Sequence, residues 1–388
     1  MERRLRRCVR VLNAHAALAR IHFIKKPAHF ALTGRCCALA PRRAAVTTAR
    51  GPGAQQPPPG VRGAGTGAAF ALGHHGGAHL ATSHRRSDAL AGIMLAAVRA
   101  RNAALRFPGR VAVVVGGTAG IGRAVALRLA EAQYGVIVVG RDATRGAEVV
   151  AACAAASGPG AKHEFLRCDA SLLSAVRATA ADVASRRPAI DALVLTQGMA
   201  SMDGFTPTAE GLDTKLSLHY YSRVAFVQAL LPSLRAAPAP RVLAVLSAGV
   251  HGEYKHAEAD FELRKHYGLK AAADAAGCYT DAAWDSLSRE AGNERVTFVH
   301  AAPGFVASSW GTELPWAVRG LTRLAQRFAT PAADAAEFLV EPLLRESTAG
   351  GFLLQGPAGQ PAAPVPQHAA TREGIWAATR ALLARVAA

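Results

Sequence analysis

The stretch VAVVVGGTAGIGRAVALRLA, residues 111–130, joins a short run of β-branched residues to a helical pattern through a loop of glycines. Such an apolar run is typical of a strand buried on both faces. Glycines at this place allow a tight turn and a close approach of the backbone to a pyrophosphate at the helix N-terminus. The stretch therefore predicts a dinucleotide loop, although a purely structural turn would use the same residues. The residues assigned to the loop are Gly116, Thr118, Gly120, Ile121 and Gly122.

Strand and helix patterns alternate on the carboxyl side of this loop. Alternation of this kind implies right-handed crossovers and a parallel, doubly wound α/β sheet. We expect a single domain over residues 90–388, opened by a helix from Asp88 and closed by a strand, a Pro-rich loop and a helix. The expected strands are 111–115, 135–140, 163–169, 190–198, 241–247 and 295–304, and the expected helices between them include 123–133, 147–156, 172–186, 210–237 and 269–291.

The positive charge is concentrated at the amino-terminal end. The chain of 388 residues has a net charge of +18. Residues 1–110 hold 19 Lys and Arg against two acids, which leaves 26 basic and 25 acidic residues (45 − 19 and 27 − 2) for residues 111–388. A nucleic-acid-binding domain would gather its basic residues on a folded face, so no nucleic-acid partner is expected.

Residues 1–89 form a basic leader that we expect to be disordered. The leader is rich in Arg, Ala, Gly and Pro and poor in acids, as organelle transit peptides are. Its few Ser and Thr favour a mitochondrion over a plastid. Alternatively the leader has no targeting role, or translation starts at Met94, and the protein is cytoplasmic. No run of about 18 apolar residues predicts a membrane-spanning helix.

The GxxxGxG spacing at this place resembles that of the short-chain dehydrogenase/reductase family. The match extends over residues 111–310 and is diffuse towards retinol-dehydrogenase-like and carbonyl-reducing members. In RCDAS, Asp169 matches the acid that contacts adenine, while Gly198 is what remains of the Asn-Asn-Ala-Gly turn. The turn beside the nicotinamide is matched by Pro303, Gly304, Val306 and Ser308. The resemblance implies a Rossmann-type fold and an NAD(P)-dependent oxidoreductase acting on CH–OH or C=O groups of a small molecule.

The end of the second strand bears on the choice of cofactor. In this family an acid there suits NAD, and a basic residue suits the 2′-phosphate of NADP. The strand ends in VVGRD, which places Arg141 first and Asp142 one residue later. Arg is permanently charged and binds phosphate well. We therefore expect NADP, with NAD as the alternative.

Two catalytic residues are expected near strand ends and on the long helix. Ser247 ends the strand RVLAVLS, where the family holds the substrate oxygen with a serine. The family's asparagine is missing, and His219 stands in its place. Since imidazole both donates and accepts, His219 could serve a proton relay, or it could be an ordinary core histidine.

The family's tyrosine and lysine are expected in the stretch RKHYGLKAAADAAG, residues 264–277. The family spacing is Tyr-x-x-x-Lys, and here Tyr267 and Lys270 are one residue closer. Partners three or four apart share one face of a helix, so the shorter spacing does not forbid the pair. Lys270 would also hold the nicotinamide ribose. Tyr279 is the alternative acid, and a chain without a catalytic tyrosine is the third possibility.

Several further expectations concern partners. The apolar segment around Trp310 and Trp316 would cover a lipophilic substrate, pack as an ordinary helix, or touch a membrane surface. A homo-oligomer is possible. The six cysteines show no metal-binding spacing, and no metal site is expected. The missing asparagine and the odd Tyr/Lys spacing leave open a protein that binds NAD(P) without turnover, as a sensor or scaffold.

Overall fold

The computed structural model describes residues 76–308, 311, 314–345 and 349–387, and the chain divides into two compact units, Met1–Thr82 and Ser83–Ala388. Most of the expected leader therefore lies outside the described residues. The helix expected from Asp88 begins earlier, because α2 spans Gly76–Ala104. None of the helices that the structure describes combines the length and apolarity needed to cross a bilayer.

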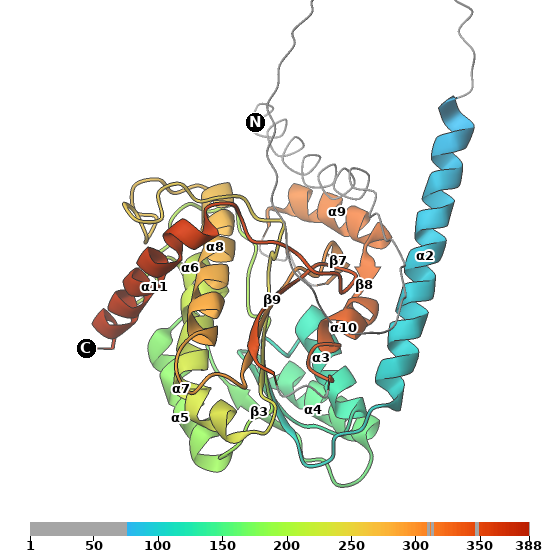
Figure 1. Cartoon of the computed structure of the whole chain (residues 1–388), viewed down its shortest axis with the longest axis horizontal. Helices are drawn as coiled ribbons and strands as arrows, with labels where there is room; N and C mark the ends of the chain where they lie inside the picture. The colour runs from blue at the N-terminus through green and yellow to red at the C-terminus, as the bar shows by residue number, and fades with distance from the viewer. Residues whose placement is uncertain (1–75, 309–310, 312–313, 346–348, 388) are drawn as a thin grey trace, which may run out of the picture. The chain divides into compact units, whose positions relative to one another are not determined.

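The described part of the second unit is built on a seven-stranded sheet in which every pairing is parallel, as the alternating patterns predict (Figure 1). The strand order is β3-β2-β1-β4-β5-β6-β9. The chain winds outward from β1 in both directions, so the carboxyl ends of β1 and β4 form the switch point where such folds bind ligands. The strands are β1 Val111–Val115, β2 Gly135–Gly140, β3 Glu164–Arg167, β4 Ala192–Leu195, β5 Arg241–Val245, β6 Thr297–Ala301 and β9 Gly351–Gln355.

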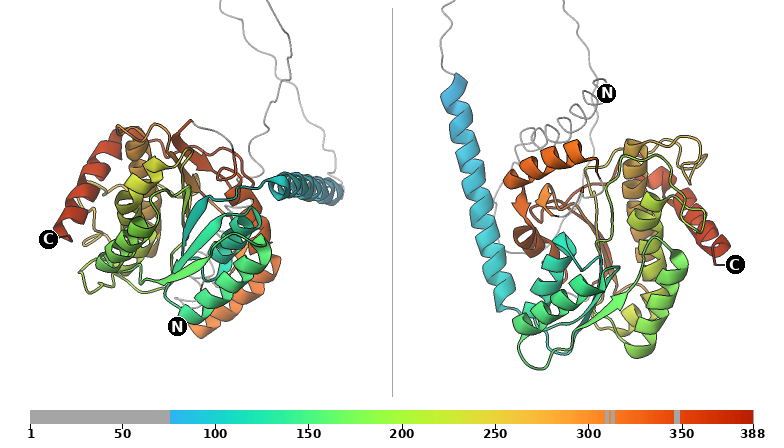
Figure 2. Two further views of the ribbon diagram at one scale, coloured as in Figure 1. Left: turned by 90° about the horizontal axis from the view of Figure 1, so that it is seen from below. Right: turned by 180° about the vertical axis from the view of Figure 1, so that it is seen from behind.

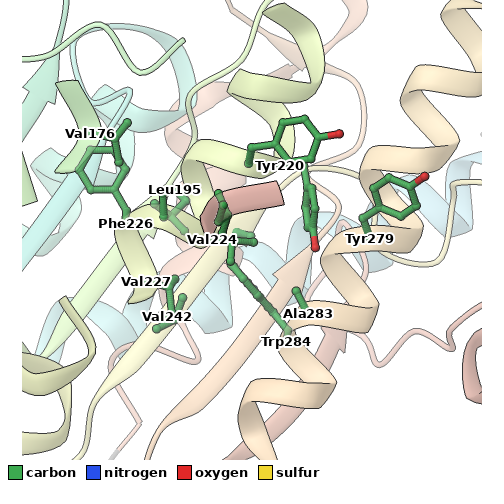
Figure 3. Packing of buried hydrophobic residues seen from close by; sticks show 14 of the residues in the cluster. Val176, Leu195, Tyr220, Val224, Phe226, Val227, Val242, Tyr279, Ala283 and Trp284 are labelled. Atoms are coloured by element: carbon green, nitrogen blue, oxygen red, sulfur yellow. The ribbon is translucent and has the colours of Figure 1, made fainter. Parts of the chain in front are cut away.

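Helices cover both faces of the sheet (Figure 2). Side chains alternate along each strand, so Val113 and Val115 join one hydrophobic cluster while Ala112 and Val114 join another. Figure 3 shows part of the first cluster, where Tyr220, Tyr279 and Trp284 pack between helices and sheet. The helices of this side are α5 Leu173–Arg186, α7 Ser222–Ala236, α8 Leu269–Ser288 and α11 His368–Arg385; the other side has α3 Gly120–Glu131, α4 Ala143–Ser157 and α10 Ala332–Val340.

The long helix expected over 210–237 is shorter and interrupted. A single turn, α6 Thr214–Leu216, leads into a π-helical stretch, η1 Ser217–Tyr221, before α7 begins. π-Helical turns are rare and occur frequently at functional sites. The interruption lies at the residue that the family resemblance assigned to the proton relay.

Residues after β6 form a small layer of short elements. β7 (Val306–Ala307) pairs with β8 (Thr330–Pro331), and α9 (Trp316–Ala325) followed by η2 (Gln326–Phe328) lies between them in the chain. Figure 1 shows α9 above β7, β8 and α10.

Candidate active site

The glycine loop lies between β1 and α3 at the switch point of the sheet. Gly116 and Gly120 have positive φ, +81° and +53°, a conformation that glycine adopts without strain. A Cβ on Gly122 would collide with the carbonyl oxygen of Gly116, and one on Gly116 would lie 2.7 Å from Thr196 Oγ1. The close packing of backbone on backbone therefore requires these glycines, and it leaves the N-terminus of α3 directed at the site.

The other two loop residues contribute differently. The side chain of Thr118 packs against Gly140 at the end of β2, where a Cβ would lie 2.7 Å from Thr118 Cγ2. Ile121 packs against the hydrophobic cluster on the α3 side of the sheet. The side chains of Thr118 and Ile121 therefore hold the loop against the sheet.

Arg141 and Asp142 follow β2 and have separate tasks. Asp142 is the N-cap of α4: its Oδ1 accepts a hydrogen bond from the backbone N–H of Arg145 at 3.0 Å, and its Oδ2 lies 3.1 Å from Arg145 Nε. Arg141 is exposed and makes no ion pair with any described residue. The carboxylate of Asp142 is thus committed to the helix, while the guanidinium of Arg141 is available.

Asp169 follows β3 and Gly198 follows β4, the strands that flank β2 and β1 in the sheet. Asp169 Oδ1 accepts hydrogen bonds from the backbone N–H and the hydroxyl of Ser171, at 3.0 and 2.7 Å. A Cβ on Gly198 would lie 2.8 Å from Nε2 of His219. Glycine is needed here because the imidazole lies directly on the turn after β4.

The imidazole of His219 supports that turn. Its Nε2 accepts a hydrogen bond from the backbone N–H of Met199 at 3.1 Å. Burial and the charges of Arg223 and Lys215 lower the pKa of His219 to about 3. The ring is therefore neutral at physiological pH and carries its proton on Nδ1, so Nε2 is not free for a relay.

Arg223, which the sequence analysis did not single out, links the ends of two strands. Its guanidinium is buried and donates to the carbonyl oxygens of Gln197, at 2.7 Å, and Val245, at 3.0 Å. Gln197 follows β4 and Val245 ends β5. Burial lowers the pKa of Arg223 to about 9, which leaves it charged at neutral pH and holds the two strand ends together.

Ser247 lies just beyond β5, as expected. Its backbone N–H donates to Nε2 of His300 at 3.0 Å, and its carbonyl oxygen accepts from the backbone N–H groups of Val250 and His251. The Ser247 hydroxyl is buried and has no hydrogen-bond partner among the described residues. Buried hydroxyls are normally satisfied, and this one lies at the carboxyl edge of the sheet, where folds of this kind bind ligands.

One face of α8 packs along the segment from Ser247 to Gly252. Asp274 Oδ1 accepts from the backbone N–H of Gly252 at 2.8 Å, and Cys278 Sγ donates to the carbonyl oxygen of Gly252 at 3.2 Å. Gly277 lies against the ring of His251, where any Cβ would collide. His251, which lies on the loop after β5, therefore packs against this face of α8 close to the end of β5.

Three side chains, those of His251, Asp281 and His300, link this face of α8 to Ser247 through hydrogen bonds. His251 Nε2 lies 3.0 Å from Asp281 Oδ2, and His300 Nδ1 lies 2.5 Å from Asp281 Oδ1. The rings of His251 and His300 are stacked, with centroids 6.0 Å apart. Since His300 Nε2 accepts from the Ser247 N–H, His300 is neutral and donates from Nδ1 to Asp281.

The charges of His251, Asp281 and His300 balance one another. Burial opposes ionisation of Asp281, but its interactions with His300 and His251 lower the pKa of Asp281 to about 2. Burial also opposes the charge on His251, but the hydrogen bonds to Asp281 and Cys278 raise the pKa of His251 to about 10. Burial lowers the pKa of His300. The three residues are therefore a cationic His251, an anionic Asp281 and a neutral His300.

The same three side chains have their ligand atoms within 4.8 Å of one another, as a metal site requires. Hydrogen bonds alone account for the grouping, because each histidine nitrogen that faces Asp281 uses its own carboxylate oxygen. A divalent ion would also add positive charge beside the buried Arg223, whose charge already acts on His300. The hydrogen bonds therefore explain the grouping without a metal ion.

Tyr267 does not lie on α8, because the helix begins at Leu269 with Gly268 as its N-cap. The expected helical relation between Tyr267 and Lys270 is therefore wrong. Nζ of Lys215 instead donates to the Tyr267 hydroxyl at 3.1 Å and lies 5.5 Å from the ring centroid. Lys215 is buried and belongs to α6, so the tyrosine meets a lysine that is 52 residues distant in sequence. Burial and the nearby charge of Asp213 raise the pKa of Tyr267 above its usual range.

Lys270 and Tyr279 have other partners. Lys270 Nζ forms an ion pair with Asp274 one turn along α8, and its side chain is 78% exposed. Tyr279 is buried, donates to the carbonyl oxygen of Phe261 at 3.1 Å and stacks on the Phe261 ring at 4.6 Å. Tyr279 thus belongs to the packed layer of Figure 3.

The Pro-Gly turn follows β6, as expected. Pro303 is partly buried, and Gly304 has a φ of +74° and packs within 3.1 Å of Pro357 Cβ, measured from an added Cβ. Val306 is buried in β7, and the carbonyl oxygen of Ser308 accepts from Arg323 Nη1 at 2.8 Å. The turn therefore sits at the carboxyl end of the sheet with the glycine loop and Ser247.

Five residues that the sequence analysis missed shape the site: Lys215, Arg223, His251, Asp281 and His300. A spacing signal existed for two of them. Lys215, His219 and Arg223 recur every four residues, as side chains on one face of a helix do. Nothing in the order of residues paired Asp281 with His251 or His300, which come from three separate elements.

Comparison with known proteins agrees with this architecture. A family model described as short chain dehydrogenase matches residues 110–315, more than half of the chain. Oxidoreductase AN1596 of Emericella nidulans is 32% identical over 220 residues, which are 56% of this chain and 65% of that protein. Polyprenol dehydrogenase of Mus musculus is 37% identical over 145 residues, which are 36% of this chain and 43% of that one. The chain thus spans less than two thirds of the length of both relatives.

A solved structure shares the fold. It is that of an uncharacterized protein from Mycobacterium Paratuberculosis, with a TM-score of 0.53 and 19% identity, over 72% of this chain and 95% of that one. The family match over residues 110–315 covers the glycine loop, the strand end at Ser247 and the Pro-Gly turn. The chain belongs to the short-chain dehydrogenase family.

Proposed function

We propose that the protein is an NADP(H)-dependent oxidoreductase that transfers hydride between the nicotinamide and a carbonyl or alcohol carbon of a lipophilic substrate. The observation that carries the proposal is the buried, unpartnered hydroxyl of Ser247 at the carboxyl end of β5. In open α/β sheets ligands bind at this edge. The backbone N–H of Ser247 is fixed by its hydrogen bond to His300, which holds the hydroxyl at the edge where it would donate to a substrate oxygen.

The residues of the first strands fit a dinucleotide. Gly116 and Gly122 keep side chains out of the loop, so a pyrophosphate could approach the N-terminus of α3. The exposed Arg141 suits a 2′-phosphate, while Asp142, the rival acid, is used as the N-cap of α4. These contacts favour NADP over NAD. The cofactor, when bound, supplies or accepts the hydride.

Proton transfer is assigned to Tyr267. The raised pKa keeps the Tyr267 phenol protonated at neutral pH, so a proton is present for the substrate oxygen as hydride adds to the carbon, although the same shift makes the phenol a weaker acid. Lys215, 3.1 Å from the phenol oxygen, would stabilise the phenolate left behind. The balance is that of carbonyl reduction: one hydride to carbon, one proton to oxygen. Reduction is therefore the proposed direction.

The lipophilic class of the substrate is supported by a relative. Polyprenol dehydrogenase is named for a long-chain lipid alcohol, and the present chain shares 37% identity with it over its matched residues.

A second candidate is a protein that binds NAD(P) without turnover. One observation favours it: the face of α8 that packs beside Ser247 carries Gly277 and Cys278, and Tyr267 reaches its lysine from outside the helix. Such a protein would keep the cofactor loop intact, since the glycines depend only on the first half of the sheet.

The decisive experiment measures NADPH oxidation by the full chain with long-chain aldehydes, ketones and quinones. Turnover that Ser247→Ala lowers by about 100-fold or more supports the oxidoreductase, because one charge-stabilising donor contributes on that scale. The matched control is Ser185→Ala on α5, whose hydroxyl bonds its own helix at Asp182. Tight NADPH binding with no turnover of any carbonyl would favour the second candidate instead.

A further inference from the structure

Helix α9 and the turn η2 that follows it expose large apolar side chains. Trp316 is 81% exposed, Leu324 54% and Phe328 89%. These residues are eight and four positions apart, so they lie along one side of the helix. Leu321, beside them, is 48% exposed. Single exposed apolar residues are common, but a continuous apolar stripe of this kind marks an interaction surface.

The side of α9 that faces the protein is polar. Thr322 and Gln326 are buried, and the Thr322 hydroxyl donates to the carbonyl oxygen of Val318 at 2.8 Å. Arg323 Nη1 donates to the carbonyl oxygen of Ser308, at 2.8 Å, and to Gln326 Oε1, at 2.7 Å. Surface helices normally bury their apolar face. Here the polar face is tied to the protein and the apolar face is directed outward, which requires an apolar partner.

Charge selects the partner. Between Glu313 and Asp334 the chain has no acidic residue and three arginines, Arg319, Arg323 and Arg327. The basic leader, with 15 Lys and Arg against two acids over residues 1–89, would be repelled by them. A second copy meeting the first across a two-fold axis would place the same arginines near one another. An anionic lipid surface offers an apolar interior and a negative charge together.

We propose that α9 docks on an anionic membrane surface, inserting Trp316, Leu324 and Phe328 below the lipid headgroups while the exposed Arg327 contacts the headgroup charge. Tryptophan is favoured at this depth because its ring is both apolar and polar. The docking is independent of the oxidoreductase activity proposed above, since lipid binding is measured without substrate. It would bring the carboxyl edge of the sheet close to a lipid substrate.

Fluorescence quenching by brominated lipid tests the insertion directly. Trp284 and Trp376 are buried, so Trp316 is the described tryptophan that can meet acyl chains. Vesicles of dibrominated phosphatidylcholine with phosphatidylserine should quench part of the fluorescence of the full chain, and Trp316→Phe should remove most of that quenching. Equal quenching of both proteins, or none of either, overturns the proposal.

Vesicle sedimentation separates the contributions of the side chains and of the leader. At about 0.3 M salt, where exposed charges are largely screened, Trp316→Ala with Phe328→Ala should weaken binding at least tenfold. The control Leu353→Ala removes an exposed apolar side chain from β9 and should bind as the parent does. At low salt Arg327→Glu should weaken binding to phosphatidylserine vesicles roughly tenfold and leave binding to pure phosphatidylcholine unchanged.

Two outcomes contradict the docking of α9 on lipid. If the doubly substituted chain binds vesicles as tightly as the parent, the membrane contact lies elsewhere, in the leader. If the parent is a dimer in solution and the two substitutions make it a monomer, the stripe contacts a second copy. Thermal unfolding of each variant checks that these surface changes leave the fold intact.

Discussion

The two halves of the sheet differ in the groups that form the site at their carboxyl ends. At β1 and β2 the site is made of backbone: Gly116 and Gly122 allow main chain to pack on main chain. At β5 and β6 it is made of buried ionisable side chains, where Asp281 joins His251 to His300 and His300 holds Ser247. A backbone site depends on a few neighbouring residues, whereas a side-chain site depends on every element that contributes to it.

Among the variants considered, Tyr267→Phe should separate the two halves of the sheet most clearly, by changing turnover and not cofactor binding. Removal of the phenolic hydroxyl should lower turnover by about two to four orders of magnitude, as loss of a general acid does. NADPH affinity should stay within a few-fold, because the first half of the sheet is untouched. Steady-state kinetics and cofactor titration measure the two effects separately.

Three further variants control for position. Lys215→Met should lower turnover as Tyr267→Phe does, since it removes the ammonium beside the phenol. Tyr279→Phe should keep its activity and lose some stability with the hydrogen bond to Phe261. Lys270→Met should change little, because its side chain is exposed and pairs with Asp274. If Lys270→Met inactivates the enzyme and Lys215→Met does not, the assignment of the lysine is wrong.

Asp281→Ala should destabilise the second half of the sheet by about 3–5 kcal/mol, because it leaves a buried histidine charge uncompensated. Urea unfolding followed by circular dichroism measures the change. The matched control, Asp182→Ala on α5, removes an exposed carboxylate that pairs with Arg186 and should cost at most about 1 kcal/mol. Equal losses in the free energy of unfolding would mean that the buried group of His251, Asp281 and His300 stabilises the fold no more than an exposed ion pair does.

Gly122→Val should weaken NADPH binding by roughly 100-fold, because its Cβ would collide with the carbonyl oxygen of Gly116 and force the loop apart. Isothermal titration with NADPH measures the loss. Gly320→Ala is the control, since a Cβ there meets nothing within 4 Å. Unchanged affinity in Gly122→Val would place the cofactor away from this loop.

Arg141→Asp should weaken NADPH binding roughly 10- to 100-fold more than NADH binding, because a charge-assisted contact is exchanged for repulsion. Titration of both cofactors against the same protein measures the ratio. Equal effects on the two cofactors would remove Arg141 from a 2′-phosphate site.

The smallest expected effect is a pH dependence carried by His219. Its pKa is lowered to about 3 in the folded protein, so its contribution to stability is complete above its ordinary pKa and is lost as pH falls from about 6.5 towards 3. Between pH 7.5 and 5.5 the parent should lose about 1.4 kcal/mol more than His219→Gln. Urea unfolding at the two pH values tests it, and parallel losses in both proteins would contradict the buried, neutral histidine.

Much of the first half of the sheet could be read from residue order. The apolar runs, the GxxxGxG spacing and the strand ends at Arg141 and Ser247 are local patterns, and local sterics decide them. The parallel, doubly wound sheet followed from the alternation of strands and helices and is confirmed. The beginning of α8 was within reach too, because the helix was expected from residue 269.

The chemistry of the second half depended on contacts between residues far apart in the chain. Lys215 meets Tyr267 across 52 residues, and Asp281 meets both His251 and His300 from a helix between them. Spacing on one helix had suggested Lys270 for Tyr267, but the helix starts after the tyrosine and leaves it to another lysine. Residue order settles conformation over a few residues. Which buried charges become partners is settled by packing, because only the folded core removes water and makes each charge require a neighbour.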